Sequence, residues 1–523
     1  MHLTFTDRKF TLKDLSGKTA PKSSSDWVYN PSIRAHQTTN IKAAHAFKRY
    51  ASVTVKNIFD KLMITSVPVP SVAPLVPSHL KLKDFQAERG VPFMLGQNKT
   101  YLAHQPGLGK SAQVVAAVNT SPGPALIMPP SFLKINWARE ITKWSTSHYP
   151  DIAIVQDTGK QYKVDWSADY VICPQSMLAK PWVIDAILKN DFKYKVVDEV
   201  QNFKTDGAGR STALWGGQSV DKAGAAKVKS PGLMFDCDHE IYLSGTPLLS
   251  KPIDIYPILY GAAPEVIDFM ALQDFGFKFC GAWQDPRGAW HFTGSSNEAE
   301  LHERLTADFM QIIKKVDVLK DLPEKIRSVL VMDKDPRDAE SRAIDKELLK
   351  SFDPNGSRPT TLAMYAKLHH INGLAKVDWA ADLVNYYLAG DAAEQIILYG
   401  YHRDVCEKLF TKLKRFAPEL VLGGLTDRER NRIIDRFQGG KCRLIVGNEA
   451  MNLGFTLTKA TRTIHAEYST QPEVNKQAED RLNRIGAEAA HSYHQYIVLP
   501  GSLDEKRLKS SFKRQTAIDK IIY

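Results

Sequence analysis

The stretch AHQPGLGKSAQ, residues 103–113, contains the residue types that hold the phosphates of a nucleotide. Glycines let backbone N–H groups point at phosphate oxygens, a lysine reaches the β and γ phosphates, and a hydroxyl ligates Mg²⁺ at the positive end of the following helix. The candidate phosphate-binding residues of this loop are Gly107, Leu108, Gly109, Lys110 and Ser111.

His104 stands where the pattern G-x-x-x-x-G-K-[ST] has its first glycine. The preceding TYLA, residues 100–103, predicts a buried strand, and SAQVVAAVNT, residues 111–120, predicts a helix. Strand, loop and helix are the setting that a phosphate loop requires, and its last turn matters more to that geometry than its first glycine. A structural turn without a ligand is the alternative for this loop taken alone.

An acidic pair follows in YKVVDEVQ, where a predicted strand over residues 194–199 ends in Asp198 and Glu199. An aspartate at the carboxyl end of a strand can hold Mg²⁺ through water, and the adjacent glutamate can orient and deprotonate an attacking water. Many solvated strand ends carry such a pair. Its position after a GKS loop in the same alternating α/β segment favours a role in ATP hydrolysis.

A third candidate lies in NKQAEDRLNRIG, residues 475–486, where Gln477, Arg481 and Arg484 are spaced i, i+4 and i+7. This spacing predicts one face of a helix. Two guanidinium groups on that face can stabilise transition-state charge on a γ-phosphate. The alternative is an exposed helix in which Glu479 and Asp480 pair with the arginines.

The elements that must position these residues form two series in which short β-branched runs alternate with helical stretches. Such alternation predicts parallel sheets with helices on both faces. The remaining predicted strands are residues 125–128, 170–173, 241–246, 395–400, 442–448 and 461–467. A Trp- and Gly-rich stretch near residues 275–300 separates the two series. The alternative to a functional insertion in this stretch is a surface Ω-loop with packed aromatic side chains.

Charge sets the first residues apart from the rest of the chain. Residues 1–64 hold eleven Lys/Arg and four Asp, a net charge of +7 of the chain's +11. A small basic module suits a polyanion such as nucleic acid, and a solvated basic face is the alternative. We predict four parts: a basic α+β module (1–63), a Pro-rich linker (64–80), a first lobe (81–325) with a helical insertion near 262–320, and a second lobe (326–523).

Composition excludes several classes of protein. The chain of 523 residues exceeds what one core usually serves. It has no apolar run of about 18 residues, as a membrane helix needs, and no secretory signal, so we expect a cytoplasmic location. Five separated cysteines without a C-x-x-C pair predict reduced, mostly buried thiols. They are Cys173, Cys237, Cys280, Cys406 and Cys442.

Taken together, a lead segment and six motifs in order resemble superfamily-two helicases, specifically the Swi/Snf-type DNA translocases. They are LKDFQAERG (82–90), AHQPGLGKS (103–111), LIMPPSFLKINWAREITKW (126–144), VVDEVQNFK (196–204), LSGTPLLSKPIDIY (243–256), NEAMNLGFTLTKA (448–460) and QAEDRLNRIG (477–486). The resemblance implies two RecA-like lobes that bind ATP and Mg²⁺. It also implies adenine contact by Gln86, coupling by Ser244 and Thr246, and DNA contact by Pro130, Ser131, Asn452 and Gly454.

Residues 275–301 and 316–325 also resemble the annealing-helicase, HARP-type branch, which remodels stalled forks, and residues 26–51 resemble the N-terminal module of compact bacterial and phage relatives. The resemblance implies a monomeric DNA-dependent ATPase that translocates on DNA and remodels forks or Holliday junctions in replication, recombination or repair, in a bacterial or phage-infected cell. Alternatives are a duplex translocase that displaces proteins, a strand-separating helicase, and an ATP-switched DNA-binding scaffold. His104 and Gln201 depart from the family pattern, as do Thr470 and Ala487.

Overall fold

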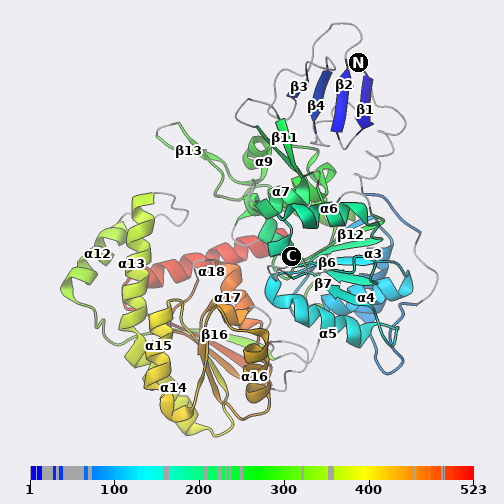
Figure 1. Ribbon diagram of the computed structural model, residues 1–523. Coiled ribbons are helices and arrows are strands. Elements are labelled where there is room, and N and C mark those ends of the chain that lie inside the picture. Colours follow the sequence, from blue (N-terminus) through cyan, green and yellow to red (C-terminus); the bar gives the residue numbers. More distant parts are fainter. Residues whose placement is uncertain are drawn as a thin grey trace.

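Figure 1 shows the computed structural model, in which two α/β lobes lie side by side. The structure describes residues 2–6, 9–13, 28–30, 35–38, 64–68, 73–156, 164–204, 209–220, 226–230, 232–234, 237–247, 251–286, 288–319, 323–350, 359–452, 455, 457–469, 471–483, 487 and 489–522. Arg484 and Gly454 lie outside these residues, as does most of the predicted basic module.

The first lobe is built on a seven-stranded parallel sheet in the order β15-β5-β12-β9-β6-β8-β7. Its strands are β5 (Lys99–His104), β6 (Ala125–Met128), β7 (Ile152–Ile154), β8 (Tyr170–Ile172), β9 (Tyr194–Val197), β12 (His239–Leu243) and β15 (Met310–Ile313). The predicted α/β class with two parallel sheets is confirmed. Near-continuous apolar runs form these strands because both faces of the sheet are covered.

Side-chain alternation assigns the two faces. Leu102 and Ile127 pack with α3 (Val91–Leu95), α4 (Lys110–Thr120) and α5 (Lys134–Trp144). Their neighbours Tyr101 and Met128 face the opposite core. That core is covered by α6 (Pro181–Lys189), α7 (Gly209–Trp215), α8 (Tyr256–Ala262), α9 (Leu272–Phe279) and α10 (Glu298–Asp308).

The Trp- and Gly-rich stretch lies within the predicted insertion. A two-stranded hairpin of β13 (Trp283–Gln284) and β14 (Trp290–His291) projects between α9 and α10 (Figure 1). A second hairpin pairs β10 (Gly217–Val220) with β11 (Ala226–Ser230). The Trp- and Gly-rich stretch therefore contains a hairpin, formed by β13 and β14, rather than an Ω-loop.

The second lobe holds a six-stranded parallel sheet in the order β16-β21-β20-β17-β19-β18. The strands are β16 (Glu324–Val331), β17 (Ile396–Tyr399), β18 (Glu419–Val421), β19 (Leu444–Gly447), β20 (Arg462–His465) and β21 (His491–Val498). One face packs on α14 (Val377–Gly390) and α15 (Arg403–Lys412), and the other on α16 (Asp427–Gln438) and α17 (Pro472–Glu479). The remaining helices are α12 (Ala339–Lys350), α13 (Pro359–Ala375) and α18 (Leu503–Ile522).

Three segments lie outside these cores. The N-terminal strands β1 (His2–Thr6), β2 (Lys9–Lys13), β4 (Ala35–Thr38) and β3 (Val28–Asn30) form one antiparallel sheet. The Pro-rich segment is fixed to the first lobe, since Ile64 N donates to Glu265 Oε1 (2.6 Å) and Leu75 N to Thr120 Oγ1 (2.9 Å). Helix α18 packs against α17 and also against α10, so it connects the lobes (Figure 1).

Two further expectations concern the chain as a whole. Within the described residues, no helix combines the length and apolarity needed to cross a bilayer. All five cysteines are free thiols, and four of them are buried, which confirms the cysteine prediction.

Glu467 fixes the start of α15. Its Oε2 accepts hydrogen bonds from the backbone N–H groups of Tyr401 (2.7 Å) and His402 (3.0 Å), and its Oε1 lies 2.7 Å from His402 Nδ1. Gly373 on α13 makes room for this carboxylate, because a Cβ there would come within 2.1 Å of Glu467 Oε1. The buried carboxylate thus joins β20, α13 and α15.

This contact predicts a pH-dependent stability. Hydrogen bonding to Glu467 raises the pKa of His402, so its stabilising effect is complete below the unfolded-state pKa of about 6.5 and is lost as pH rises through the raised folded-state pKa. We expect His402→Gln to lower Tm most below about pH 6 and progressively less at alkaline pH. Thermal unfolding across this range measures the difference, with exposed His148→Gln as control. A Tm difference that does not change with pH would contradict the prediction.

Candidate active site

Three candidate segments meet at one edge of the first sheet. Strands β5, β12 and β9 are adjacent and parallel, so the loops that follow them leave at their shared carboxyl ends. The phosphate loop follows β5, Ser244 and Thr246 follow β12, and Asp198 and Glu199 follow β9. Topology therefore brings together groups that lie in three separate parts of the sequence.

The phosphate loop has the expected backbone. Gly107 (φ 89°) and Gly109 (φ 69°) are left-handed, and Gly109 precedes the first residue of α4, Lys110. Ser111 is the second residue of that helix, where free backbone N–H groups and the helix dipole favour an anion. The Lys110 ammonium donates to the His104 carbonyl at 2.8 Å.

Gln86 lies against this loop. It begins the short helix η2 (Gln86–Gly90) and is buried, and its Nε2 donates to the Leu108 carbonyl at 2.9 Å. Its Oε1 accepts from Lys83 N at 2.8 Å. The predicted adenine-contacting residue is therefore fixed to the backbone of the predicted phosphate-binding loop.

His104 ends β5 as a fully buried side chain. Its Nε2 lies 3.0 Å from Gln311 Oε1 on β15, and its Nδ1 lies 3.4 Å from Gln113 Nε2 on α4. Burial, with the nearby Lys110 charge, lowers the pKa of His104 to about 3, so the imidazole is neutral at pH 7. A histidine is accommodated here because its ring points into the lobe and only its carbonyl faces Lys110.

Gly109→Ala tests the loop geometry. A Cβ at Gly109 would lie 2.5 Å from Gln86 Nε2, and the left-handed backbone adds about 1–2 kcal/mol of strain. We expect weaker ATP binding together with a lower free energy of unfolding. Gly440→Ala is the matched control, because Gly440 has φ 71° but no atom within 4 Å of the added Cβ. Calorimetric titration should show weaker ATP binding for Gly109→Ala alone; equal affinities would contradict the loop assignment.

Asp198 is a buried carboxylate held by two donors. Trp137 Nε1 on α5 donates to Oδ2 at 2.8 Å, and the Glu199 N–H donates to Oδ1 at 3.0 Å. Burial, with the adjacent Glu199 carboxylate, raises the pKa of Asp198 to about 7, against the opposing effects of Trp137 and Lys110. A nearby cation would favour its ionised form, as a Mg²⁺ site requires.

Glu199 occupies a strained backbone position, with φ 49° and ψ 52° before the short helix η5 (Val200–Phe203). Such left-handed geometry in a non-glycine residue is concentrated at functional sites. Gln201 Nε2 donates to Glu199 Oε2 at 2.5 Å and lies 3.4 Å from Thr246 Oγ1. Gln201, which replaces the family's usual histidine, thus connects the acidic pair to the predicted coupling residue.

The second lobe reaches this group through α17. Gln477 Nε2 donates to Thr246 Oγ1 at 2.8 Å, so Gln477 and Gln201 contact the same hydroxyl. Ser244 is buried, and its Oγ accepts from the Thr246 N–H at 2.9 Å. A hydrogen-bonded path therefore runs from Glu199 through Thr246 into the second lobe.

The helix predicted for the two arginines is shorter than expected. Helix α17 ends at Glu479, and Arg481 lies in the following turn, so the predicted helix does not extend to Arg481, while Arg484 lies outside the described residues. The Arg481 guanidinium is buried and donates to the Phe455 carbonyl at 3.1 Å. Burial lowers its pKa while the charge of Glu199 acts in the opposite direction, which places the two groups within electrostatic range.

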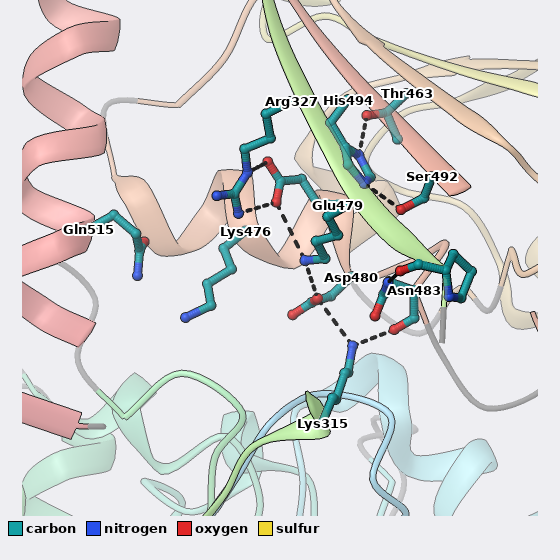
Figure 2. A network of polar contacts seen from close by, with 12 residues as sticks. Lys315, Arg327, Thr463, Lys476, Glu479, Asp480, Asn483, Ser492, His494 and Gln515 are labelled. Carbon is teal, nitrogen blue, oxygen red and sulfur yellow. Dashed lines mark hydrogen bonds and ion pairs between the residues drawn. The ribbon is translucent and has the colours of Figure 1, made fainter. Parts of the chain in front are cut away.

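In the described part of the chain, the acidic residues of this segment pair with basic residues from other elements. Glu479 accepts two hydrogen bonds from Arg327 (2.7 and 2.6 Å), and Asp480 Oδ1 accepts from Lys325 (2.7 Å) (Figure 2). The alternative of an exposed helix is wrong, because Glu479, Asp480 and Arg481 are all buried. Among the described residues, Glu479 and Asp480 thus accept hydrogen bonds from lysines and arginines outside this segment.

The candidate DNA-contacting residues are placed only in part. Pro130 is buried directly before the short helix η3 (Ser131–Leu133), and Ser131 Oγ lies 2.7 Å from Ser176 Oγ in an exposed position. Asn452 ends the short helix η9 (Glu449–Asn452), without a described side chain, and Gly454 is outside the described residues.

Two family models and several known proteins are similar to this chain. A model for the SNF2-related domain matches residues 86–343, and a model for the helicase conserved C-terminal domain matches residues 376–486. A Xenopus laevis "SWI/SNF-related matrix-associated actin-dependent regulator of chromatin subfamily A-like protein 1" is 28% identical over 437 residues, covering 81% of this chain and 42% of the relative.

Other matches are similar in extent. The human "DNA annealing helicase and endonuclease ZRANB3" is 28% identical over 81% of this chain and 39% of its own length. An "Uncharacterized ATP-dependent helicase" of Mycoplasma pneumoniae is 25% identical over 92% of this chain and 46% of its own length. The chain thus spans less than half the length of these relatives. A solved "Sulfolobus solfataricus SWI2/SNF2 ATPase core in complex with dsDNA" has 20% identity and a TM-score of 0.39, with 88% of this chain and 99% of that chain covered.

Proposed function

Because the chain belongs to the Swi/Snf-type branch of superfamily two, with a SNF2-related and a helicase C-terminal domain, we propose that it is a DNA-dependent ATPase that translocates on DNA and remodels branched DNA. The observation that supports this most directly is the path from Glu199 through Gln201 and Thr246 to Gln477. It links the acidic pair of one lobe to the arginine segment of the other, so hydrolysis and lobe movement are coupled.

The residues present fit MgATP. Left-handed Gly109 directs the first N–H groups of α4 outward, and the buried Asp198 carboxylate is suited to a hard cation. Arg481 Nε is buried without a hydrogen-bond partner among the described residues, a donor that a phosphate oxygen would satisfy. When bound, MgATP supplies the γ-phosphoryl group that is transferred to water.

Each residue then has one role. Lys110, which here donates to the His104 carbonyl, would bind the phosphates instead, while Ser111 and Asp198 would hold Mg²⁺. Glu199 orients the attacking water and accepts its proton. Arg481, Arg484 and Gln477 complete the site when the lobes close, and both halves of the site come from one chain, which suits a monomer.

DNA is the second substrate in this proposal. Backbone phosphates are contacted by residues of both lobes, namely Pro130 and Ser131 in the first and Asn452 and Gly454 in the second. Each hydrolysis cycle therefore shifts these contacts along one strand. Sequence preference is weak because phosphate contacts carry no base information. The net charge of +7 in residues 1–64 favours binding where several duplex arms meet. We expect the protein to catalyse fork regression, branch migration or strand annealing during replication, recombination or repair. The Mycoplasma relative supports a bacterial setting.

ATP turnover without DNA, with single strands, with duplex and with a four-way junction tests the proposal. We expect strong stimulation by DNA, greatest with the junction, and a marked decrease with rising salt because phosphate contacts are screened. Turnover that no DNA stimulates would contradict it. A protein lacking residues 1–63 should keep duplex stimulation but lose the preference for the junction.

Two assays separate the rival functions. Migration of a mobile Holliday junction distinguishes a branch remodeller from a translocase that displaces a bound protein and from a helicase that separates strands at a free end. An ATP-switched scaffold would bind nucleotide tightly and show no DNA-stimulated turnover. The complete set of Asp198, Glu199 and Arg481 favours a motor over such a scaffold.

A further inference from the structure

Lys315 joins the phosphate loop to the arginine segment. It is the first residue of α11 (Lys315–Val318), directly after β15, the strand beside β5. Its backbone N–H donates to Gln105 Oε1 at 2.8 Å, and the Gln105 N–H donates to the Ile313 carbonyl at 3.1 Å. Any shift of the loop at Gln105 therefore moves the base of the Lys315 side chain.

The other end of Lys315 lies in the second lobe. Its ammonium donates to Asp480 Oδ1 at 3.1 Å and to the Asn483 carbonyl (Figure 2). Lys315 and Asp480 are both buried, although 165 residues separate them. Buried charges are costly unless paired and hydrogen-bonded, so this contact fixes the turn between Asp480 and Asn483 against the first lobe.

Arg481 lies inside that turn. Helix α17 has ended, and backbone hydrogen bonds from the Arg481 N–H to the Ala478 carbonyl (3.2 Å) and from the Leu482 N–H to the Glu479 carbonyl (3.2 Å) form the turn, so its direction depends on contacts with neighbouring elements. The turn is held at one side by Lys315 and Lys325 on Asp480, and at the other by Arg481 itself on the Phe455 carbonyl. The direction of the Arg481 guanidinium consequently depends on where Lys315 places its neighbour.

We propose that Lys315 is a positioning residue that transmits the position of the phosphate loop to Arg481 through Gln105 on one side and Asp480 on the other. The proposal rests on the proposed function, in which Arg481 stabilises charge during ATP hydrolysis. Lys315 touches neither nucleotide nor Glu199 in this assignment. It sets the geometry in which the two lobes form one site.

Lys325 provides a matched control. Its ammonium contacts the same Asp480 oxygen at 2.7 Å, but it belongs to β16 in the second lobe's own sheet. Replacing either lysine removes one of the two ammonium groups that contact Asp480 and leaves the other in place. Neither variant therefore leaves the buried Asp480 carboxylate unpaired. Only Lys315 also bonds to the phosphate loop.

The experiment compares Lys315→Met, Lys315→Arg and Lys325→Met for DNA-stimulated ATP turnover. For Lys315→Met we expect kcat to fall by about 10- to 100-fold, as when a remote change misplaces a reacting group, with little change in KM. Lys315→Arg should recover part of the loss, because arginine keeps the charge. Lys325→Met should leave kcat near the wild-type value while lowering Tm. Equal loss of kcat in Lys315→Met and Lys325→Met would overturn the proposal.

A second readout does not depend on activity. Spin labels at Tyr149→Cys in the first lobe and Tyr386→Cys in the second, both exposed, report the distance between lobes in the full chain with Cys237→Ser. We expect one narrow distribution for wild type and Lys325→Met, and a broader or displaced one for Lys315→Met. Distances that are unchanged in Lys315→Met would overturn the role of Lys315, whatever the turnover data show. Absence of DNA-stimulated turnover in the wild-type protein would contradict only the proposed function.

Discussion

Replacing Glu199 with glutamine is expected to lower DNA-stimulated ATP turnover by about 10²- to 10⁴-fold, the contribution of a general base. The amide keeps the size of the side chain and can still accept from Gln201, but it cannot take a proton from water. ATP affinity should stay near the wild-type value, because the phosphate loop is unchanged. Single-turnover hydrolysis and calorimetric ATP binding measure the two effects separately.

Glu199→Asp is the companion variant. It retains a carboxylate at the strained position, with φ 49°, but shortens its reach, so turnover between that of wild type and Glu199→Gln is expected. If Glu199→Gln hydrolyses ATP at nearly the wild-type rate, the base assignment is wrong, whatever the binding data show.

Arg481→Ala should reduce kcat by about 10³- to 10⁵-fold, the range found for arginines that stabilise charge in phosphoryl transfer. The structure gives the reason: the guanidinium is buried, lies within electrostatic range of Glu199, and keeps its Nε without a partner in the described part of the chain. Arg481→Lys should recover little of the rate, because an ammonium lacks the planar fork of donors. Rapid-quench hydrolysis at saturating ATP and DNA measures the loss.

Arg430→Ala is the matched control for this prediction. Arg430 also spans the lobes, since its guanidinium donates to the Phe132 carbonyl at 3.3 Å and lies over the Phe455 ring. Its removal deletes a positive charge between the lobes but leaves the bonds of Asp480 to Lys315 and Lys325 in place. A much smaller loss of kcat is expected, and equal losses in the two variants would contradict a specific role for Arg481.

The sequence predicted the first sheet well where strands are apolar. ALIM formed a strand over the predicted residues 125–128, because four buried apolar residues between helices suit a central parallel strand. The prediction for residues 241–246 was shifted, since β12 begins at His239 and ends at Leu243. His239 and Glu240 are polar yet buried, and their partners Gln97 and Lys99 are on distant parts of the chain.

Several residues of the candidate site had no signal in the sequence. Trp137 lies in a motif that does not indicate its partner, and its bond to Asp198 joins residues 61 positions apart. Lys315 has no distinctive pattern, because it is a lysine after a strand, and Gln105 differs from the family's usual residue before the glycines without indicating its partner. Only the parallel pairing of β15 with β5 places them together.

By itself, the sequence determined the local chemistry: a glycine–lysine–serine loop between a strand and a helix, an acidic pair after an apolar strand, and two parallel α/β series. These depend on neighbouring residues, whose types set backbone freedom and periodicity. Tertiary structure alone decided where α17 ends and what Arg481 faces. The carboxylates of Glu479 and Asp480 bond to Arg327, Lys325 and Lys315, and buried charges select partners by proximity in space rather than in sequence.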